Sequence, residues 1–83
     1  MEKGNNPEKW NSLLAFLDER LQFGLLEHLR RVESYHFEDD TLFIKAGSKN
    51  DERYLRKEPV LQQLTVIACE TTGVKSVAIE DLG

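Results

Sequence analysis

Two histidines and one cysteine are the side chains of this sequence best suited to metal binding or nucleophilic chemistry. His28 is expected on a helix and His36 on a strand, and no cysteine or histidine pair stands at zinc-ligand spacing. Cys69 follows apolar residues and has no nucleophile motif around it, so we expect it to be buried or half-buried. The sequence therefore predicts no metal site. We expect His36 to be a surface histidine, with a contact or pH-sensitive role as the alternative.

Acidic residues gather in the segment 38–40, close to Glu33. A calcium loop of the EF-hand type spreads its ligands over about 12 residues around a central glycine. The segment lacks this pattern. We expect a solvated turn, with cation binding or a partner contact as the alternatives.

The loop 47–50 is similar to the Gly-x-x-Gly loop with which KH modules clamp nucleotides. Asn50 replaces the second glycine, and the next residues, Asp51 and Glu52, would repel phosphates. The sequence has no glycine-rich phosphate loop, and its serines lie in no recognisable catalytic motif. We therefore expect a non-catalytic protein without a cofactor.

The length and charge of the chain limit the classes of protein to which it can belong. Its 83 residues suffice for one compact domain, which we expect over residues 7–81 after a disordered tail over residues 1–6. The net charge of −4 disfavours sequence-independent binding of nucleic acid, which depends on lysine and arginine neutralising phosphates. Direct contact with nucleic acid is therefore not expected.

The cellular compartment is inferred from cysteine content and hydropathy. A single cysteine cannot form an internal disulfide, which fits a reducing cytosol. No apolar run approaches the ~20 residues of a membrane span, and the polar N-terminal segment does not have the apolar stretch of a signal peptide. We expect a cytoplasmic protein that does not contact a membrane.

Apolar periodicity predicts four helices. The first starts at Asn6, as N-cap, and Pro7, and its apolar stripe consists of Trp10, Leu13, Leu14, Leu17 and Leu21. A second helix is expected over residues 23–30. A third runs through residues 53–56, capped by Asn50 or Asp51. The fourth begins near Pro59 and ends at Gly73.

Alternating apolar residues predict three strands. Tyr35 and Phe37 share one face of the first strand, and a polar turn over residues 38–40 leads into the second, over residues 41–46. Because this turn has no glycine, we expect a loop longer than two residues. Residues 74–80 form the third strand. The order α-α-β-β-α-α-β predicts an α+β domain, a three-stranded sheet with helices packed on one face.

Four aromatic residues are candidate anchors for a protein partner, because exposed aromatics often dominate binding energy. These candidates are Trp10, Phe23, Phe43 and Tyr54. Basic residues near the last of them, Arg53 and Arg56, could form a polar rim around it. Core or edge packing for the aromatics, and a solvated helix face for the arginines, are the alternatives.

The residues that carry a family resemblance lie between Trp10 and Glu80. They are the stripe that begins at Trp10, the segment 39–44 (Asp-Asp-Thr-Leu-x-Ile), Tyr54-Leu55, the helix ending in Gly73, and Val77-x-Ile79. This pattern resembles the N-terminal domain of the bacterial replication initiator DnaA. It also resembles the C-terminal domain of the clamp-loader gamma/tau subunit of bacterial DNA polymerase III. The resemblance implies a KH-like fold and a role in protein assembly.

Two departures from the initiator pattern favour the gamma/tau domain. Leu26 and Leu29 stand where the initiator domain usually carries aromatics, and Asn50 and Asp51 stand where it tends to be apolar. The resemblance therefore implies an interaction domain whose partners are polymerase, helicase or clamp-loader proteins, with weak self-association, and a chain excised from a longer protein. The alternatives are an initiator domain that recruits the helicase and self-associates around Trp10, and a KH-like nucleic-acid-binding module.

Overall fold

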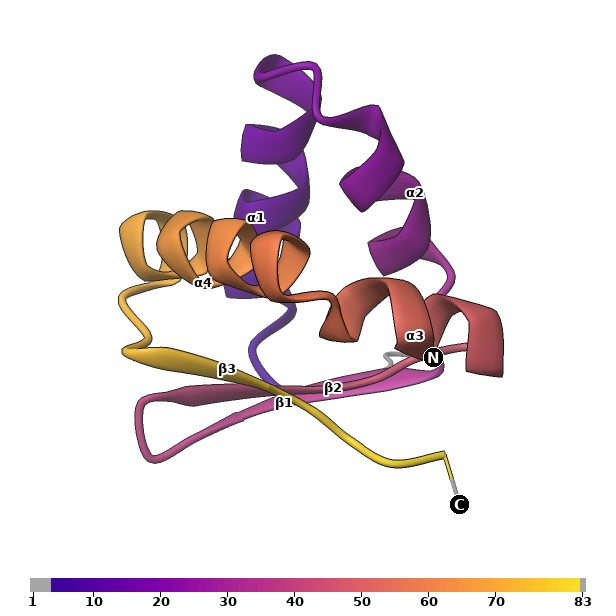
Figure 1. Cartoon of the computed structure of the whole chain (residues 1–83). Coiled ribbons are helices and arrows are strands. Elements are labelled where there is room, and N and C mark those ends of the chain that lie inside the picture. Colours follow the sequence, from indigo (N-terminus) through magenta and orange to yellow (C-terminus); the bar gives the residue numbers. More distant parts are fainter. Residues whose placement is uncertain (1–3, 83) are drawn as a thin grey trace.

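The structure, a computed structural model, describes residues 4–82. In this part of the chain, four helices cover one face of a three-stranded sheet, and no helix covers the other face (Figure 1). The α+β architecture and the element order confirm the prediction. The elements are α1 (Pro7–Glu19), α2 (Phe23–Arg30), β1 (Ser34–Glu38), β2 (Thr41–Lys45), α3 (Lys49–Arg56), α4 (Glu58–Thr72) and β3 (Ser76–Ile79).

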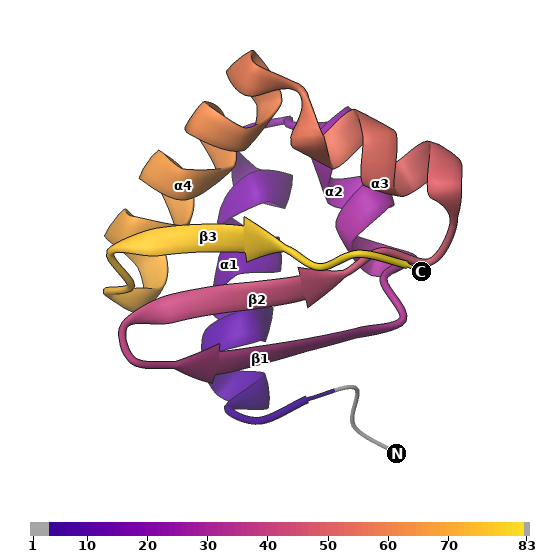
Figure 2. The same ribbon diagram turned by 60° about the horizontal axis from the view of Figure 1, so that its bottom comes forward.

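The sheet is mixed, with strand order β1-β2-β3. β1 and β2 form an antiparallel hairpin, whereas β3 runs parallel to β2 after the chain has crossed over through α3 and α4. Figure 2 shows the sheet in front of the helices, with β1 and β3 as its two edges. Both edge strands therefore have one side that is not paired with another strand of the described chain.

The turn between β1 and β2 differs from the prediction. Glu38 pairs directly with Thr41, so the loop contains only two residues. These residues, Asp39 and Asp40, have φ angles of 51° and 59°. Two successive positive φ angles are what a type I′ turn requires, and its twist matches that of the flanking strands. The expectation of a longer loop was wrong, because aspartate tolerates the left-handed conformation at a modest cost.

α1 begins where the sequence predicted, with Asn6 at the N-cap and Pro7 as the first helical residue. Trp10, Leu13 and Leu17 are buried as expected. Leu21 is not part of the buried stripe, because the helix ends at Glu19 and Leu21 follows with φ 59° and its side chain 70% exposed.

α3 is capped by a different residue from the two that we predicted. Ser48 is the N-cap, and its Oγ accepts a hydrogen bond of 3.2 Å from the amide of Asp51. This is the usual bond from a third-position amide to a capping hydroxyl, so the helix begins two residues before Asp51. α4 agrees with the prediction. Pro59 lies in its first turn and Gly73, with φ 81°, ends it in the left-handed conformation that glycine adopts without strain.

The core lies between the helices and the covered face of the sheet. The indole of Trp10 stacks on the ring of Tyr35, with centroids 4.3 Å apart, and so joins α1 to β1. Leucines from all four helices fill the remaining space with Leu42 and Ile44 of β2. Burying one such side chain contributes about 1.5–3 kcal/mol.

Part of the expected N-terminal tail contacts the domain. Residues 1–3 of the tail lie outside the described residues. The side chain of Asn5 donates to the carbonyl of Phe37 at 2.9 Å and accepts from the amide of Phe37 at 2.7 Å. One amide side chain thus satisfies both backbone groups of an edge residue of β1.

Two further expectations concern the burial of Cys69 and helices that could cross a membrane. Cys69 is exposed on α4, contrary to the expectation of a buried or half-buried thiol. The buried residues of this helix are Leu64, Ile67 and Ala68, and Cys69 is not one of them. Within residues 4–82, no helix has the length and apolar character that crossing a membrane would require.

Candidate interaction surface

The predicted anchors do not form one surface. Trp10 is only 5% exposed, so its ring belongs to the core and offers little to a partner. Phe43 lies on the uncovered face of the sheet, half-buried against the imidazole of His36 at a centroid distance of 4.6 Å. Tyr54 is half-buried and stacks on His28 at 3.8 Å. Phe23 is 50% exposed and is the only one of the four aromatics that is mainly in solvent.

The two predicted arginines have different surroundings. Arg53 is exposed on α3. The Nη2 atom of Arg56 donates to the carbonyl of Ile79 at 3.0 Å and lies 3.5 Å from the carboxylate of Glu52 and 3.7 Å from that of Asp81. Glu52 is buried and accepts a further bond from the amide of Leu82 at 3.2 Å. Arg56 and Glu52 together hold the segment after β3 against α3.

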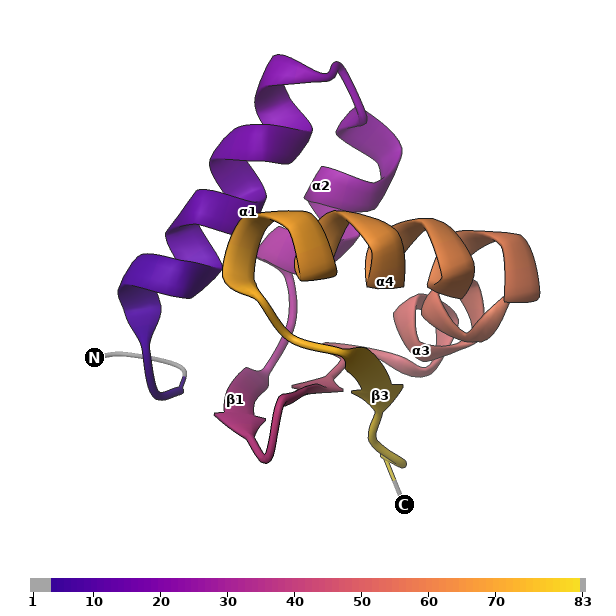
Figure 3. The ribbon, with the colours of Figure 1, turned by 90° about the vertical axis from the view of Figure 1, so that its left-hand side faces the viewer.

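Three large apolar residues among residues 4–82 are exposed. Leu21, Phe23 and Val66 are 70%, 50% and 57% exposed. The first two flank Gln22, and Gln22 lines the same open cleft as Val66. This cleft of ≈ 480 Å³ runs between the end of α1 and α4. The two helices are in contact and cross each other (Figure 3). We call this surface the α1–α4 face. Its lining residues are Phe16, Arg20, Gln22, Gln63, Val66, Ile67 and Glu70.

Only part of this surface is predicted from the sequence. The sequence predicts Phe23, at the start of the second helix, as a partner anchor. It does not predict a role for Val66, and it predicts a buried position for Leu21. Val66 stands next to the buried Ile67 on α4. Which of two neighbouring apolar residues faces solvent depends on the direction from which α1 approaches, and that is a property of the packed molecule.

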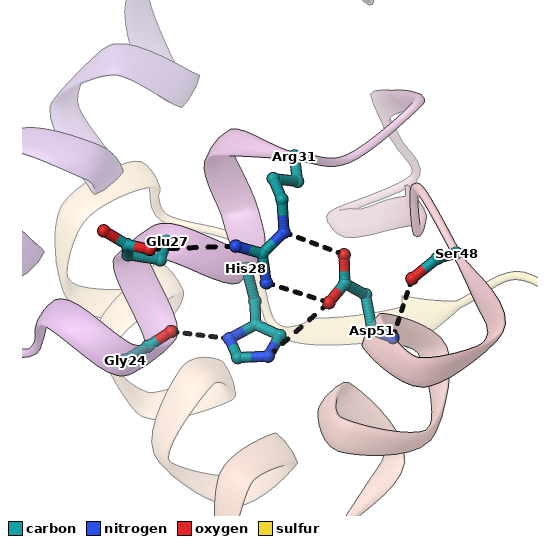
Figure 4. Close-up of polar contacts among 6 residues, drawn as sticks. All are labelled: Gly24, Glu27, His28, Arg31, Ser48 and Asp51. Atoms are coloured by element: carbon teal, nitrogen blue, oxygen red, sulfur yellow. Dashed lines mark hydrogen bonds and ion pairs between the residues drawn. The ribbon is translucent and has the colours of Figure 1, made fainter.

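A polar cluster joins α2 to α3 (Figure 4). The guanidinium of Arg31, just after α2, donates to both carboxylate oxygens of Asp51, from Nε to Oδ2 at 3.2 Å and from Nη2 to Oδ1 at 3.0 Å. His28 places its Nε2 atom 3.5 Å from Asp51 Oδ1. A bidentate pair of this kind fixes orientation as well as distance. Asp51 is buried, although it is charged, because these partners satisfy it.

The electrostatics of the cluster follow from that pairing. The hydrogen bond from Arg31 lowers the pKa of Asp51 below its ordinary value of 3.8, against the opposing effect of burial, and the charge of Arg31 and the nearby imidazole of His28 add to the lowering. The same bond raises the pKa of Arg31. Asp51 is therefore ionised throughout the neutral range.

Serine, histidine and aspartate occur together here, yet their arrangement does not suit nucleophilic catalysis. In a catalytic triad the imidazole keeps one nitrogen free to take the serine proton. The Nδ1 atom of His28 donates to the carbonyl of Gly24 at 2.7 Å, and the Nε2 atom faces Asp51. The Oγ atom of Ser48 accepts from the amide of Asp51. Among the contacts of residues 4–82, both ring nitrogens of His28 thus face groups other than the Ser48 hydroxyl, and the cluster acts as a clamp between two helices.

Neither a search for metal-binding clusters nor comparisons with known proteins reveal a further site. Among residues 4–82, no group of three or more histidine, cysteine, aspartate or glutamate side chains is arranged to hold a metal ion. Comparison of the chain with protein-family models, with curated protein sequences and with solved structures gives no match.

Proposed function

We propose that this chain is a non-catalytic protein-interaction domain of the bacterial DNA replication machinery, comparable to the C-terminal domain of the clamp-loader gamma/tau subunit. The observation that carries the interaction role is the α1–α4 face. Val66 exposes its side chain in the lining of the cleft, and the exposed Leu21 and Phe23 flank Gln22, another residue of that lining. Exposed apolar groups favour burial against a partner, and an exposed aromatic such as Phe23 is a natural anchor.

The replication role has its support in the residue pattern between Trp10 and Glu80 that resembles the two replication domains. The non-catalytic role is supported by the polar cluster, where the ring nitrogens of His28 face the carbonyl of Gly24 and the carboxylate of Asp51 rather than the Ser48 hydroxyl. Polymerase, helicase or clamp-loader proteins are the proposed partners, and the cytoplasm is the proposed location.

Affinity capture tests this proposal. The immobilised chain is incubated with a bacterial lysate treated with nuclease, and bound proteins are identified by mass spectrometry. We expect polymerase, helicase or clamp-loader proteins to be recovered by the original chain and lost, about tenfold or more, with Phe23→Ser and Val66→Ser, since truncating an interface anchor costs more than 1 kcal/mol. Ala15→Ser, on the exposed side of α1, is the matched control and retains capture.

Three results would contradict the proposal. Absence of replication proteins from the bound fraction would remove the replication role. Equal capture by the Phe23→Ser and Val66→Ser variants would remove the α1–α4 face. Capture that disappears only after nuclease treatment would point to the KH-like nucleic-acid module instead.

A further inference from the structure

β3 presents an open backbone edge that differs from the other edge of the sheet. At β1, both backbone groups of Phe37 are already paired with the side chain of Asn5. β3 is the opposite edge of the sheet (Figure 2), and its residues Ser76 and Val77 line a groove beside α4. An exposed strand edge with unpaired backbone groups is a template for another extended chain.

The hydrogen bonds around β3 show which residues point outward. The amide of Glu80 donates to the carbonyl of Ile44 at 2.7 Å, so Glu80 faces β2. In a parallel ladder, alternate residues bond to the same neighbour. Val77 and Ile79 therefore direct their backbone groups away from β2. The carbonyl of Ile79 confirms this orientation, because it accepts its hydrogen bond from Arg56 of α3.

Arg56 closes one half of the edge and leaves the other half open. Its guanidinium occupies the space beside Ile79 and Asp81. The amide and carbonyl of Val77 remain directed toward the groove. An incoming strand can thus align with the first half of β3 and must end or bend away before Arg56.

The groove beside Val77 has room for a side chain as well as a backbone. It has a volume of ≈ 540 Å³ and is formed by one side of α4 and the start of β3. Leu61, Val66 and Val77 give it apolar walls, and Glu58 is the charged residue of its lining. An apolar side chain fits between the walls, and a basic side chain complements Glu58. The lining consists of Glu58, Leu61, Gln62, Thr65, Val66, Ser76 and Val77.

The geometry points to this α4–β3 groove as a binding site for an extended peptide segment of a partner protein, added to the sheet as a strand alongside Val77. The segment would carry an apolar residue for the groove and a basic residue opposite Glu58. This inference rests on the proposed interaction function and specifies its form. Val66 connects the two surfaces, since it lines both the groove and the cleft of the α1–α4 face.

A second copy of the chain fits the edge less well. Antiparallel pairing of two β3 strands that uses both outward residues would place Val77 of one copy opposite Ile79 of the other. That register needs the Ile79 carbonyl of each copy, which Arg56 already holds. A peptide from another protein needs only the open half.

Peptide titration followed by amide chemical shifts tests the inference. The probe is a capped heptapeptide in which valine alternates with threonine or lysine. Its control is the same peptide with N-methyl groups at alternate backbone nitrogens, which removes donors without changing side chains. We expect the probe at up to millimolar concentration to shift the amides of Val77, Leu61 and Thr65, and the control to shift them at least tenfold less. An equal response to both peptides, or shifts confined to other surfaces, would overturn the inference.

Variants connect the response to the groove. Val77→Pro removes an outward amide and keeps the ladder to β2, so we expect a folded protein that no longer responds. Ala78→Pro removes a ladder amide and is expected to lower the unfolding temperature. If Val77→Pro also fails to fold, Leu61→Ser provides the same test, because Leu61 lines the groove and not the cleft. A Leu61→Ser variant that responds like the original chain would refute the site.

Separate variants distinguish failure of the proposed replication function from failure of the proposed peptide site. Phe23→Ser should lose capture of replication proteins and keep the peptide response, whereas Leu61→Ser should lose the peptide response. Light scattering after size-exclusion chromatography measures the mass in solution and so tests whether a second copy of the chain occupies the edge. A concentration-dependent dimer that disappears in Val77→Pro would assign the edge to a second copy and overturn the peptide inference.

Discussion

Asp51 is a buried carboxylate whose surroundings determine its chemistry. A guanidinium, an imidazole and a helix-capping hydroxyl surround it, and each contributes to lowering its pKa. These groups come from α2, from the residue just after it and from the start of α3, in segments that no sequence motif joins. The sequence identified Asp51 only as a candidate cap and as a charge that repels phosphates. Its role as the centre of a clamp follows from the crossing of the two helices, which residue types alone do not specify.

Replacing Asp51 with asparagine tests this clamp. Since the pKa of Asp51 is lower in the folded protein than its ordinary value of 3.8, ionisation stabilises the fold above that value and the contribution is lost as the pH falls below it. We expect Asp51→Asn to lower the free energy of unfolding at pH 7 by about 1–2 kcal/mol. Denaturant unfolding from pH 7 downward measures the difference from the original chain, which should shrink below pH 3.8.

Asp81→Asn is the control for the loss of a carboxylate. Asp81 is 80% exposed and contacts Arg56 at 3.7 Å, so its replacement should change stability little. A difference for Asp51→Asn that stays constant down to the lowest pH would show that ionisation of Asp51 does not stabilise the fold.

At the scale of elements, the sequence predicted what local pattern controls. The stripe of Leu25, Leu26 and Leu29 and the basic C-terminal turn gave α2 its correct bounds. Gly73 correctly predicted where α4 ends. Two of the errors at element boundaries share one cause. The turn after Glu38 and the cap of α3 depend on backbone conformations that several polar residues can adopt, and the surrounding packing selects among them.

The hairpin turn provides a test at this scale. Asp40 has φ 59°, a conformation that costs an L-residue about 1–2 kcal/mol and glycine almost nothing. We expect Asp40→Gly to raise the free energy of unfolding by about 1 kcal/mol, measured by urea unfolding. Ser34→Gly, at a β1 position without positive φ, should instead lower it by about 0.5–1 kcal/mol. Destabilisation by Asp40→Gly would contradict a type I′ turn.

At the scale of the whole molecule, the helices leave one face of the sheet uncovered, and the charges on that face argue against nucleic acid. Lys45, the basic residue at the end of β2, lies 3.0 Å from the carboxylate of Glu33. His36 faces Glu38 at 3.7 Å. The stacked rings of His36 and Phe43 could in principle accept a base, but Lys45, the lysine on this face, is already paired with a carboxylate. The partner surfaces proposed above lie elsewhere, around α4.

The last prediction separates a protein-binding domain from a KH-like nucleic-acid module. Phosphate binding is strongest at low salt, where counterion release contributes most. With a net charge of −4 and the loop 47–50 leading into the acidic first turn of α3, we expect labelled single-stranded DNA and RNA to show no change in fluorescence anisotropy at low salt. Glu33→Lys and Glu38→Lys together would place two positive charges beside the stacked rings, and this variant should gain weak binding that salt abolishes. Salt-sensitive binding by the original chain would instead mean that the uncovered sheet face, or the loop before α3, binds phosphates despite its carboxylates.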